Sequence, residues 1–440
     1  MTDHLQVQHL LNFIDNSPSP WHAVNRIEAE LAASSDAQMP VWQLLDETAK
    51  WILQPGGRYY VVRDDSSIVL FVPGQKSLVD TGFKMIGAHT DSPGLRIKPK
   101  AATCADGLLR LGVEIYGGPI LATFTDRDLS LAGRISYKND QGSVANTLIR
   151  FDNALMRLPN LAIHMNRGVN EDGLKLHKQI ELPLIASTIT EEQLPGPYFS
   201  SLIEQQSGID AERILFWDLN VYDTQKGAFW GANNEFYADS QLDNLASCHA
   251  ALVALQEASS LGSDSTLVCA FFDHEEIGSG SNRGADGSFL SDVLQRIAFA
   301  TGIDREDYQR ALARSFLISA DMAHAYHPNF PNAYEPDHKA IVNQGPVIKV
   351  NASHRYSSES ISEAMFADWC EQANVPYQKY SHRCDLPCGS TIGPIASAKL
   401  GIRAVDVGSP LWAMHSIRES AGVKDHGYMI KVMKTFFSSF

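Results

Sequence analysis

Histidine and carboxylate side chains form five clusters along the chain, and most of these clusters follow short apolar segments. They contain His89 with Asp91, Asp243, Glu275 with Glu276, Asp321 with His324, and His415. Two histidines and three carboxylates drawn from this set suit zinc, manganese or cobalt, which bind nitrogen and oxygen donors. A carboxylate that bridges two ions about 3.5–4 Å apart gives the two-metal arrangement that cleaves amides and phosphates. The residue types therefore predict a hydrolytic metal site.

Each cluster also has a simpler explanation when it is taken alone. Asp243 is then more often a helix N-cap, and Asp91 could cap a turn. His415 fits a surface histidine, and Glu275 with Glu276 fits a solvated loop. The conjunction favours metal binding, because so many carboxylates gathered without a cation would repel one another.

The segments around these clusters predict how the side chains are positioned. Strands are expected at residues 59–62, 68–72, 83–88, 266–272, 315–320 and 403–407, and a helix at 244–257. An earlier helix is expected to start at Ser19 and Pro20. Strands that alternate with helices predict an α/β fold with a mostly parallel sheet and helices on both faces. Ligands bind beyond the carboxyl ends of such strands, so the clusters should meet in one region.

The middle of the chain has a different pattern. Apolar residues alternate with other residues over 109–115 and 129–135, which is typical of antiparallel strands. We therefore predict a catalytic domain of residues 1–97 and 235–440. Residues 98–234 are predicted to form an inserted β-rich domain.

Charge and composition exclude several classes of protein. The 440 residues carry a formal net charge of -15, which argues against nucleic acid or an anionic membrane as the main partner. The longest apolar runs, such as 68–72 and 267–272, are far shorter than the roughly 20 residues of a bilayer span. No basic segment followed by an apolar one opens the chain, so no secretory signal is expected. The prediction is a soluble, cytoplasmic protein.

The cysteines and the glycine-rich segments do not provide a competing chemistry. The six cysteines are too sparse for a disulfide scaffold and are interpreted as free and mostly buried, so a metal must be held by nitrogen and oxygen. The segment that starts at His274 lacks the second histidine of H-E-x-x-H, because Gly278 takes its place. No G-x-S-x-G nucleophile motif is present.

The order and wording of the motifs closely resemble the aspartyl aminopeptidase family of metallopeptidases. The matching motifs are His-Thr-Asp-Ser-Pro at 89–93, Leu-Asp-Asn-Leu at 242–245, Asp-His-Glu-Glu-Ile-Gly-Ser at 273–279, Ser-Ala-Asp-Met-Ala-His at 319–324, Gly-Pro-Val-Ile-Lys-Val-Asn at 345–351, Cys-Gly-Ser-Thr-Ile-Gly-Pro at 388–394 and Met-His-Ser-Ile-Arg at 414–418. The resemblance spans nearly the whole chain. One departure is Arg283, where the family pattern leads us to expect glutamine.

The resemblance implies a role for each site residue. Two zinc ions would be bound, one by His89, Asp243 and Asp321, the other by Asp243, Glu276 and His415. Asp243 would bridge the ions, with manganese or cobalt as alternative metals. Glu275 would be the general base that takes a proton from a metal-bridged water, and Asp91 would orient His89. The family further implies that His324, Lys349 and Tyr356 line the substrate pocket.

The implied activity is release of N-terminal amino acids, preferentially Asp or Glu, from peptides with a free N-terminus. The net negative charge does not forbid acidic substrates, since screening acts over about 8 Å and the ions and Lys349 dominate locally. The family also implies a homo-oligomer, a tetrahedral dodecamer built from dimers. In this assembly the inserted domain of residues 98–234 would serve in oligomerisation and substrate capping. His164 of that domain would reach into the active site of a neighbouring subunit.

Several alternatives share part of this pattern. A two-metal deacylase or carboxypeptidase of the same fold would use most of the same ligands, and an aminopeptidase could prefer neutral residues. A non-catalytic scaffold would be expected to lose a ligand or the base, whereas all five ligands and Glu275 are present. An NAD-dependent enzyme would need a glycine fingerprint that the chain misses at the third glycine.

Overall fold

The computed structural model describes residues 2–33, 39–190 and 192–439, which fall into two compact units. The first unit comprises Met1–Asp91, Gly227–Met414 and Glu419–Phe440. The second comprises Ser92–Lys226 and the short segment His415–Arg418. The domain boundaries predicted from the sequence, after residues 97 and 234, differ from these by a few residues. The return of residues 415–418 to the second unit was not predicted.

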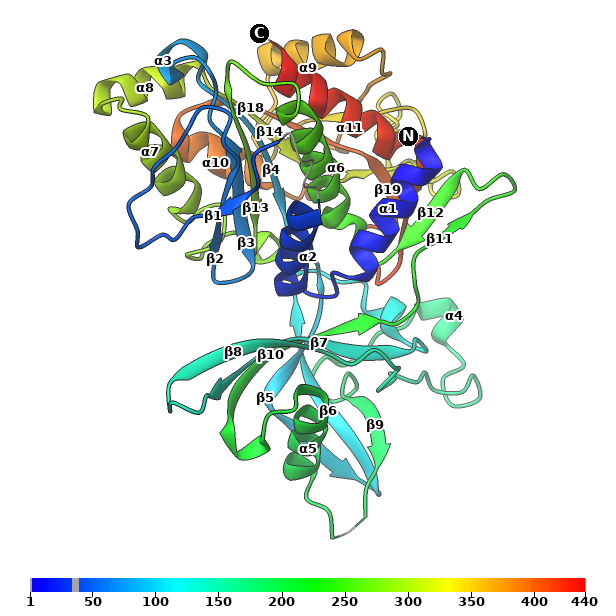
Figure 1. The fold of residues 1–440 in the computed structure, drawn as a ribbon. Helices are drawn as coiled ribbons and strands as arrows, with labels where there is room; N and C mark the ends of the chain where they lie inside the picture. Colours follow the sequence, from blue (N-terminus) through cyan, green and yellow to red (C-terminus); the bar gives the residue numbers. More distant parts are fainter. Residues whose placement is uncertain (1, 34–38, 191, 440) are drawn as a thin grey trace. The chain divides into compact units, whose positions relative to one another are not determined.

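A nine-stranded sheet forms the centre of the first unit (Figure 1). In spatial order its strands are β1 (Gln43–Leu44), β2 (Tyr59–Arg63), β3 (Ser67–Val72), β13 (Thr266–Phe272), β4 (Phe83–His89), β14 (Phe316–Ala320), β18 (Arg403–Gly408), β16 (Val347–Val350) and β17 (Gln378–Ser381). The four strands β13, β4, β14 and β18 are parallel. Strands β3 and β16, which flank them, run antiparallel to their inner neighbours. The predicted α/β class is confirmed, and the flanks make the sheet mixed.

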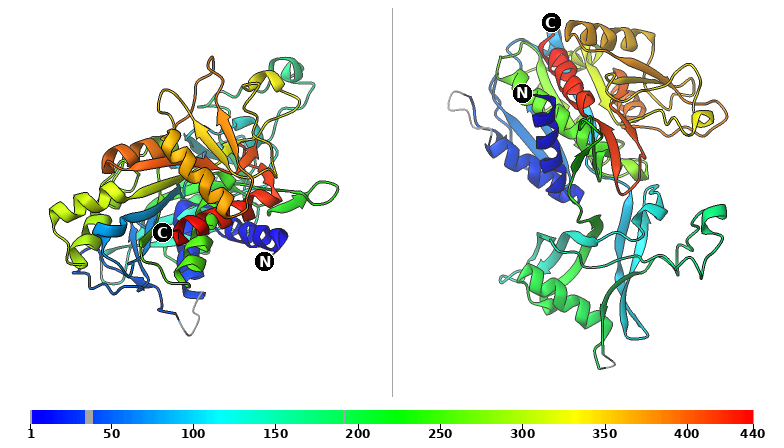
Figure 2. Two further views of the ribbon diagram at one scale, coloured as in Figure 1. Left: turned by 90° about the horizontal axis from the view of Figure 1, so that it is seen from above. Right: turned by 90° about the vertical axis from the view of Figure 1, so that its right-hand side faces the viewer.

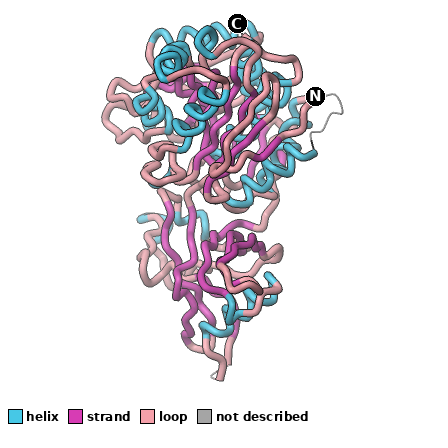
Figure 3. Tube along the Cα trace, turned by 60° about the vertical axis from the view of Figure 1, so that its left-hand side comes forward, coloured by secondary structure: helices cyan, strands magenta, loops and turns pink. Residues whose placement is uncertain are grey.

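The central strands are buried on both faces, which explains their continuous apolar sequence. In β13, Leu267, Cys269 and Phe271 belong to one core cluster and Val268, Ala270 and Phe272 to the other. The first cluster includes apolar residues of α1 (Asp3–Asp15), α2 (Pro20–Ala33), α6 (Leu242–Ser259), α9 (Ser360–Gln372) and α11 (Val423–Ser438). The second includes residues of α7 (Phe289–Ala300), α8 (Arg305–Arg314) and α10 (Ile392–Leu400). Helices thus cover both faces (Figure 3).

Helix α2 begins at the signal that the sequence carries. Pro20 opens α2, and the Ser19 hydroxyl accepts a hydrogen bond from the backbone N–H of His22. Helix α6 contains the predicted helix 244–257 and is almost wholly buried. It lies beside α11 and near α1 (Figure 2). A short helix, α3 (Leu78–Thr81), precedes β4.

A small sheet of five short strands completes the first unit. In spatial order these are β11 (Ala228–Trp230), β12 (Phe236–Asp239), β20 (Glu419–Gly422), β19 (Pro410–Trp412) and β15 (Ala323–His324). Strand β15 follows β14 after only two residues. The small sheet therefore continues the chain from the edge at which the central parallel strands end.

The second unit is built on a six-stranded sheet in which every neighbouring pair is antiparallel. Its order is β8 (Val144–Arg150), β7 (Leu129–Lys138), β10 (Ile214–Asp223), β5 (Gly94–Ala105), β6 (Leu108–Tyr116) and β9 (Leu184–Thr188). Helix α5 (Pro195–Ser207) buries Phe199 and Ile203 in the same core cluster as the strands. A single turn, α4 (Val169–Asp172), lies between β8 and β9. The alternation over 109–115 and 129–135 correctly predicted antiparallel strands.

Two further predictions concern membranes and thiols. Over the described parts of the chain, no helix is long and apolar enough to cross a membrane. All six cysteines are free, as predicted. Only Cys248, Cys269 and Cys370 are buried, whereas Cys104 and Cys384 are exposed, so the expectation that most are buried holds for half of them.

Candidate metal centre

Three neighbouring parallel strands bring predicted ligands to one edge of the central sheet. His89 is the last residue of β4, and Asp321 directly follows β14. Glu275 and Glu276 lie in a 3-10 turn, η3 (Glu275–Ile277), just after β13. Because β13, β4 and β14 are adjacent and parallel, their carboxyl ends meet, as the α/β rule for ligand sites requires.

The His89 ring is oriented for metal binding. It is 1% exposed, and its Nδ1 lies 2.9 Å from the backbone oxygen of Asp91, so Nδ1–H donates there. The Nε2 lone pair then faces Asp243 Oδ1 at 3.5 Å and Asp321 Oδ1 at 4.0 Å. Metal-bound histidines characteristically donate their second N–H to a carbonyl or carboxylate. Asp91 orients the ring here through its backbone oxygen, and its carboxylate lies 3.4 Å from the same nitrogen.

Asp243 is held at the start of α6 by contacts that the sequence did not reveal. Its backbone N–H donates to Glu419, a carboxylate that is 2% exposed. The side chain of the next residue, Asn244, donates to the backbone oxygen of Ala320, at the end of β14. The peptide bond between Asp243 and Asn244 is cis. These contacts place the Asp243 carboxylate beside the ends of β4 and β14.

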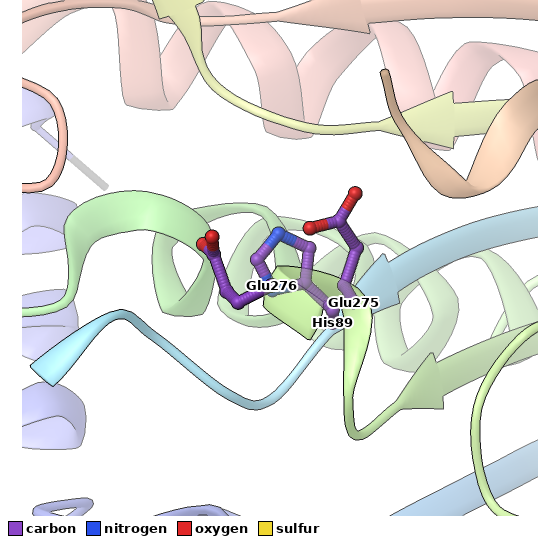
Figure 4. A group of neighbouring side chains, drawn as sticks. All are labelled: His89, Glu275 and Glu276. Atoms are coloured by element: carbon purple, nitrogen blue, oxygen red, sulfur yellow. The ribbon is translucent and has the colours of Figure 1, made fainter. Parts of the chain in front are cut away.

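The carboxylate of Asp91 fixes the turn that carries the two glutamates. Its two oxygens accept hydrogen bonds from the backbone N–H groups of Glu275 and Glu276. Figure 4 shows the Glu275 and Glu276 side chains on either side of the His89 ring. Each of the three offers a ligand atom within 4.8 Å of the others. Asp91 therefore supports both the histidine and the glutamates.

The pKa values of this cluster show what crowded burial does to acids. Burial, together with the charges of Asp321, Asp91 and Asp243, raises the pKa of Glu275 to about 8. Burial and neighbouring carboxylates likewise raise the pKa of Glu276 well above its usual range and that of Asp321 to about 6. Burial by itself lowers the pKa of His89, but Asp243 and Asp91 outweigh it and raise that pKa well above normal. The cluster thus favours a bound cation.

The donor spacing fits a zinc ion. Ligands about 2.0–2.2 Å from a tetrahedral zinc lie roughly 3.3–3.6 Å from one another. His89, Asp243 and Asp321 each offer one ligand atom within 4.8 Å of the others, and the His89–Asp243 separation of 3.5 Å falls in that range. It also exceeds a normal hydrogen bond, so no direct contact closes the space between the two groups. That His89, Asp243 and Asp321 hold an ion stays a prediction, with which this spacing is consistent.

Two predicted site residues belong to the second unit. His415 lies in the segment 415–418, where its Nδ1 is 3.1 Å from the backbone oxygen of Gly118. His164 lies on an exposed turn before α4, next to the exposed Ile163 and Met165. Their roles as second-ion ligand and as substrate contact remain predictions.

The predicted pocket residues surround Asp321. Lys349 is 3% exposed, and its ammonium donates to the backbone oxygens of Asp321 and Met322, 2.9 and 3.2 Å away. It also lies 3.7 Å from the Asp321 carboxylate and 5.2 Å from the centre of the Tyr356 ring. Burial, followed by a hydrogen bond with Cys388, raises the pKa of Tyr356. The third residue, His324, lies on β15, with its ring centre 5.9 Å from that of Tyr380.

Sequence reasoning missed the residues that support the site rather than form it. Glu419, Asn244 and Tyr380 were not singled out. Glu419 follows a Ser-Ile-Arg segment and not an apolar strand, so the pattern that found the other acids passes over it. Tyr380 pairs with Lys349 across β16 and β17, and this contact depends on register between distant segments.

An α/β sheet with a buried histidine–carboxylate cluster at the ends of its parallel strands is typical of metal-dependent hydrolases. The sequence pattern of the family "Aminopeptidase I zinc metalloprotease (M18)" matches residues 13–437. The chain belongs to this family of metalloaminopeptidases, so the predicted enzyme class is confirmed.

Individual relatives match over the full length. A "Probable M18 family aminopeptidase 2" of Stutzerimonas stutzeri is 44% identical, covering 100% of this chain and 99% of the relative. One from Clostridium novyi is 42% identical, with 98% of each covered. Ape4, solved by cryo-EM in a complex with Nbr1, has a TM-score of 0.94 at 36% identity, covering 99% of this chain and 86% of the other. The S. cerevisiae mApe1 dodecamer gives 0.85 at 25% identity, covering 99% and 96%.

Proposed function

We propose that the chain releases N-terminal Asp or Glu from peptides, using two divalent ions, most simply zinc, with Glu275 as general base. The observation that carries this proposal is the position of Glu275 beside His89, with its pKa raised to about 8 by burial and neighbouring carboxylates. A base whose pKa lies near the working pH transfers protons most effectively in both directions. Family membership supports cleavage at the N-terminus over the deacylase and carboxypeptidase alternatives.

Charge balance supports two ions. Asp91, Asp243, Glu275, Glu276 and Asp321 gather around His89, and the ammonium of Lys349 lies 3.7 Å from the Asp321 carboxylate. When ionised, the five carboxylates outnumber Lys349 by four charges, which two divalent ions would neutralise. Buried charges of one sign without such compensation are strongly unfavourable. We assign the first ion to His89, Asp243 and Asp321, and the second to Asp243, Glu276 and His415.

The side chains divide the work of hydrolysis. Bound zinc would polarise the scissile carbonyl and make water more acidic. Glu275 accepts a proton from the attacking water and returns it to the leaving amine, which balances the protons of one turnover. Asp91 keeps Glu275 and Glu276 in place through their backbone N–H groups. His89 keeps its ring fixed through Nδ1, so that Nε2 stays directed at Asp243 and Asp321.

The preference for acidic residues depends on Lys349, with His324 and Tyr356 as further pocket residues. Lys349 is a buried cation beside the metal cluster, and the Tyr356 ring covers it. An acidic side chain of the substrate could pair with this ammonium in a site of low dielectric constant. His164 of a neighbouring subunit would complete the pocket in a homo-oligomer, which we propose to be a tetrahedral dodecamer. The structure of S. cerevisiae mApe1, which is that of a dodecamer, supports this assembly.

One observation favours a second candidate, a metalloaminopeptidase with a preference for neutral residues. Two of the three ammonium hydrogens of Lys349 are directed to the backbone oxygens of Asp321 and Met322. The ammonium nitrogen of Lys349 also lies 3.7 Å from the carboxylate of Asp321. Lys349 would then serve Asp321 rather than the substrate.

Hydrolysis of aminoacyl substrates with free N-terminal Asp, Glu, Leu, Ala and Lys separates these candidates. We expect zinc-reconstituted protein to cleave the Asp and Glu substrates and chelated protein to cleave none. Lys349→Met should then reduce cleavage of Asp substrates far more than that of Leu substrates. The matched control is Lys379→Met. Lys379 is a surface lysine on the neighbouring strand β17, and it pairs with Glu363 of helix α9. Preferential cleavage of Leu or Ala by the wild type would establish the second candidate instead.

The assembly is tested separately. Mass measurement of the purified protein should give about twelve times the 48.4 kDa subunit. Replacing His164 by Ala should lower activity while leaving that mass unchanged. A monomer with full activity would contradict both the dodecamer and the role of His164.

A further inference from the structure

Residues 273–284 form a folded loop that carries Glu275 and Glu276 and has an unusual backbone. His274 and Ser279 have φ angles of 67° and 62°, in the left-handed region that non-glycine residues avoid. Gly278, with φ of 96°, occupies the same region without a side chain. Each left-handed non-glycine residue costs about 1–2 kcal/mol, so side-chain contacts must hold this conformation.

Arg283 provides the central contact of the loop. Its side chain is 12% exposed, and its Nε lies 3.2 Å from Oδ2 of Asp273, whose side chain is fully buried. Its Nη2 lies 3.2 Å from Nε2 of His274. Arginine carries only donors, so His274 accepts at Nε2 and keeps its hydrogen on Nδ1. One guanidinium therefore contacts two consecutive residues directly before Glu275.

Further hydrogen bonds of the loop surround these two contacts of Arg283. Nδ1–H of His274 donates to the Ser281 hydroxyl, which also accepts from the backbone N–H of Gly284. The Ser67 hydroxyl accepts from the backbone N–H of Asp273 and donates to the backbone oxygen of Arg283. Ser67 thus fastens the two ends of the loop to each other.

Arg283 also compensates the buried negative charge of Asp273 next to the metal cluster. Burial, followed by the charge of Asp91, raises the pKa of Asp273, so this carboxylate is costly to keep ionised. The guanidinium compensates it directly. Asp273 is then removed from the excess of negative charge that the ions must balance.

We propose that Arg283 is a positioning residue that holds the loop of Glu275 and Glu276 in place and compensates the charge of Asp273. It acts through these neighbours and has no contact with the reacting atoms. This inference rests on the proposed roles of Glu275 and Glu276. It gives a physical role to Arg283, at a position where the family pattern leads us to expect glutamine.

The test compares Arg283→Met, Arg283→Lys and Arg283→Gln in the assembled, zinc-loaded protein. A displacement of about 1 Å at a catalytic group can cost 100-fold in rate, so we expect Arg283→Met to lower kcat by about 10–100-fold with little change in KM. Zinc affinity, measured by competition with a chelator, should fall by about 10–100-fold. Arg283→Lys keeps the charge and loses the two-pronged geometry, and Arg283→Gln keeps one donor group, so both should fall between Met and wild type.

A double variant and a matched control separate this role from simple stabilisation. Asp273→Asn removes the buried charge that Arg283→Met leaves unpaired, so adding it to Arg283→Met should restore part of the lost thermal stability but little of the lost kcat. Arg296→Met removes a buried-stem arginine that stacks on Trp51 and donates to the backbone oxygens of Glu47 and Ala49. It should lower thermal stability but leave kcat and zinc affinity unchanged.

Two results would overturn the proposal. One is wild-type kcat and zinc affinity in Arg283→Met. The other is an equal loss in Arg283→Met and Arg296→Met, which would make Arg283 merely stabilising. Should the wild type cleave no aminoacyl substrate, the proposed function fails, whereas the zinc-competition measurements still decide whether Arg283 acts on the centre. Should Arg283→Met not fold, the other two variants decide: lowered kcat and zinc affinity in Arg283→Lys and Arg283→Gln support the proposal, and wild-type values in both overturn it.

Discussion

Two buried histidines of the first unit, His89 and His249, respond to burial in opposite ways. Both are 1% exposed. Neighbouring carboxylates raise the pKa of His89 well above its usual value, despite the opposing effect of burial. For His249, burial and the neighbouring His426 and His9 lower the pKa well below it. Partners, and not burial alone, decide the charge of a buried imidazole.

The surroundings of His249 form a chain of three imidazoles. Nδ1 of His249 lies 2.9 Å from Nε2 of His426, and Nε2 lies 2.9 Å from Nδ1 of His9. Nε2 of His9 lies 3.2 Å from the Glu30 carboxylate. A carboxylate only accepts, so His9 donates to Glu30, His249 donates to His9, and His426 donates to His249. The donors and acceptors of the three rings are then matched along the chain.

Helix α6 carries both kinds of site. Asp243 lies at its start, and His249 lies within it about two turns further on. The carboxylates near Asp243 favour a bound cation. In the imidazole chain, by contrast, burial keeps His249 and His426 uncharged.

The first prediction removes the proposed base from the charged site. Glu275→Gln should lower kcat by about 100–10,000-fold, because the amide cannot accept the proton of water. Zinc should stay bound, since His89, Asp243 and Asp321 are untouched. Activity assays and metal analysis of the same sample check both statements. Loss of zinc together with turnover would identify Glu275 as a ligand, and Glu363→Gln on the surface serves as control.

The second prediction removes a ligand. Asp321→Asn should weaken zinc binding by roughly 100-fold or more, beyond the 10–100-fold typical of groups that only support ligands. Competition with a chelator measures this change. The control is Asp307→Asn, which removes a carboxylate paired with Arg310 on the surface of α8. Unchanged zinc affinity would remove Asp321 from the site.

These residues were predictable from the sequence because each lies next to an unmistakable element. His89, Asp321 and the Glu275–Glu276 pair follow strands whose apolar runs are continuous, and in parallel strands the ends converge. Glu275 and Glu276 are neighbours in sequence, so finding one finds the other. The central strands were predictable for the same reason.

The supporting residues could not be predicted, because their contacts join distant segments through side-chain geometry. Glu419 reaches the backbone of Asp243 across 176 positions, and Asn244 reaches Ala320 across 76. His249 lies inside an apolar helix, and nothing in its local sequence points to His9 or His426. The antiparallel flanks of the sheet depend on pairings of the same long range.

The third prediction concerns acid stability and the imidazole chain. Burial lowers the pKa of His426 to about 3, against about 6.5 in the unfolded chain. Below pH 6.5, His426 binds a proton in the unfolded state but stays unprotonated in the folded state. The stability contributed by His426 is therefore present above pH 6.5 and is lost as the pH falls toward 3, at about 1.4 kcal/mol per pH unit.

His426→Gln keeps a donor for His249 and cannot titrate, so its stability should fall less steeply with acid. Urea midpoints of wild type and variant, both metal-free, should converge between about pH 6.5 and 4.5. Removing the metal from both proteins excludes acid release of zinc as the cause. Parallel curves for the two proteins would show that folding does not lower the pKa of His426, and the contrast with His89 would fail.

The smallest effect is expected at the exposed end of the chain. The side chain of His9 is 42% exposed, so its contact with the Glu30 carboxylate should contribute at most about 1 kcal/mol. In His9→Asn the amide oxygen can still accept from His249, and we expect a loss below about 1 kcal/mol. In His9→Leu the buried Nε2–H of His249 loses its acceptor, which should cost about 1–3 kcal/mol. Equal urea midpoints for Asn and Leu would mean that His249 does not donate toward His9. Glu30 would then not set the direction of the chain, and the neutral state of His249 would rest on burial alone.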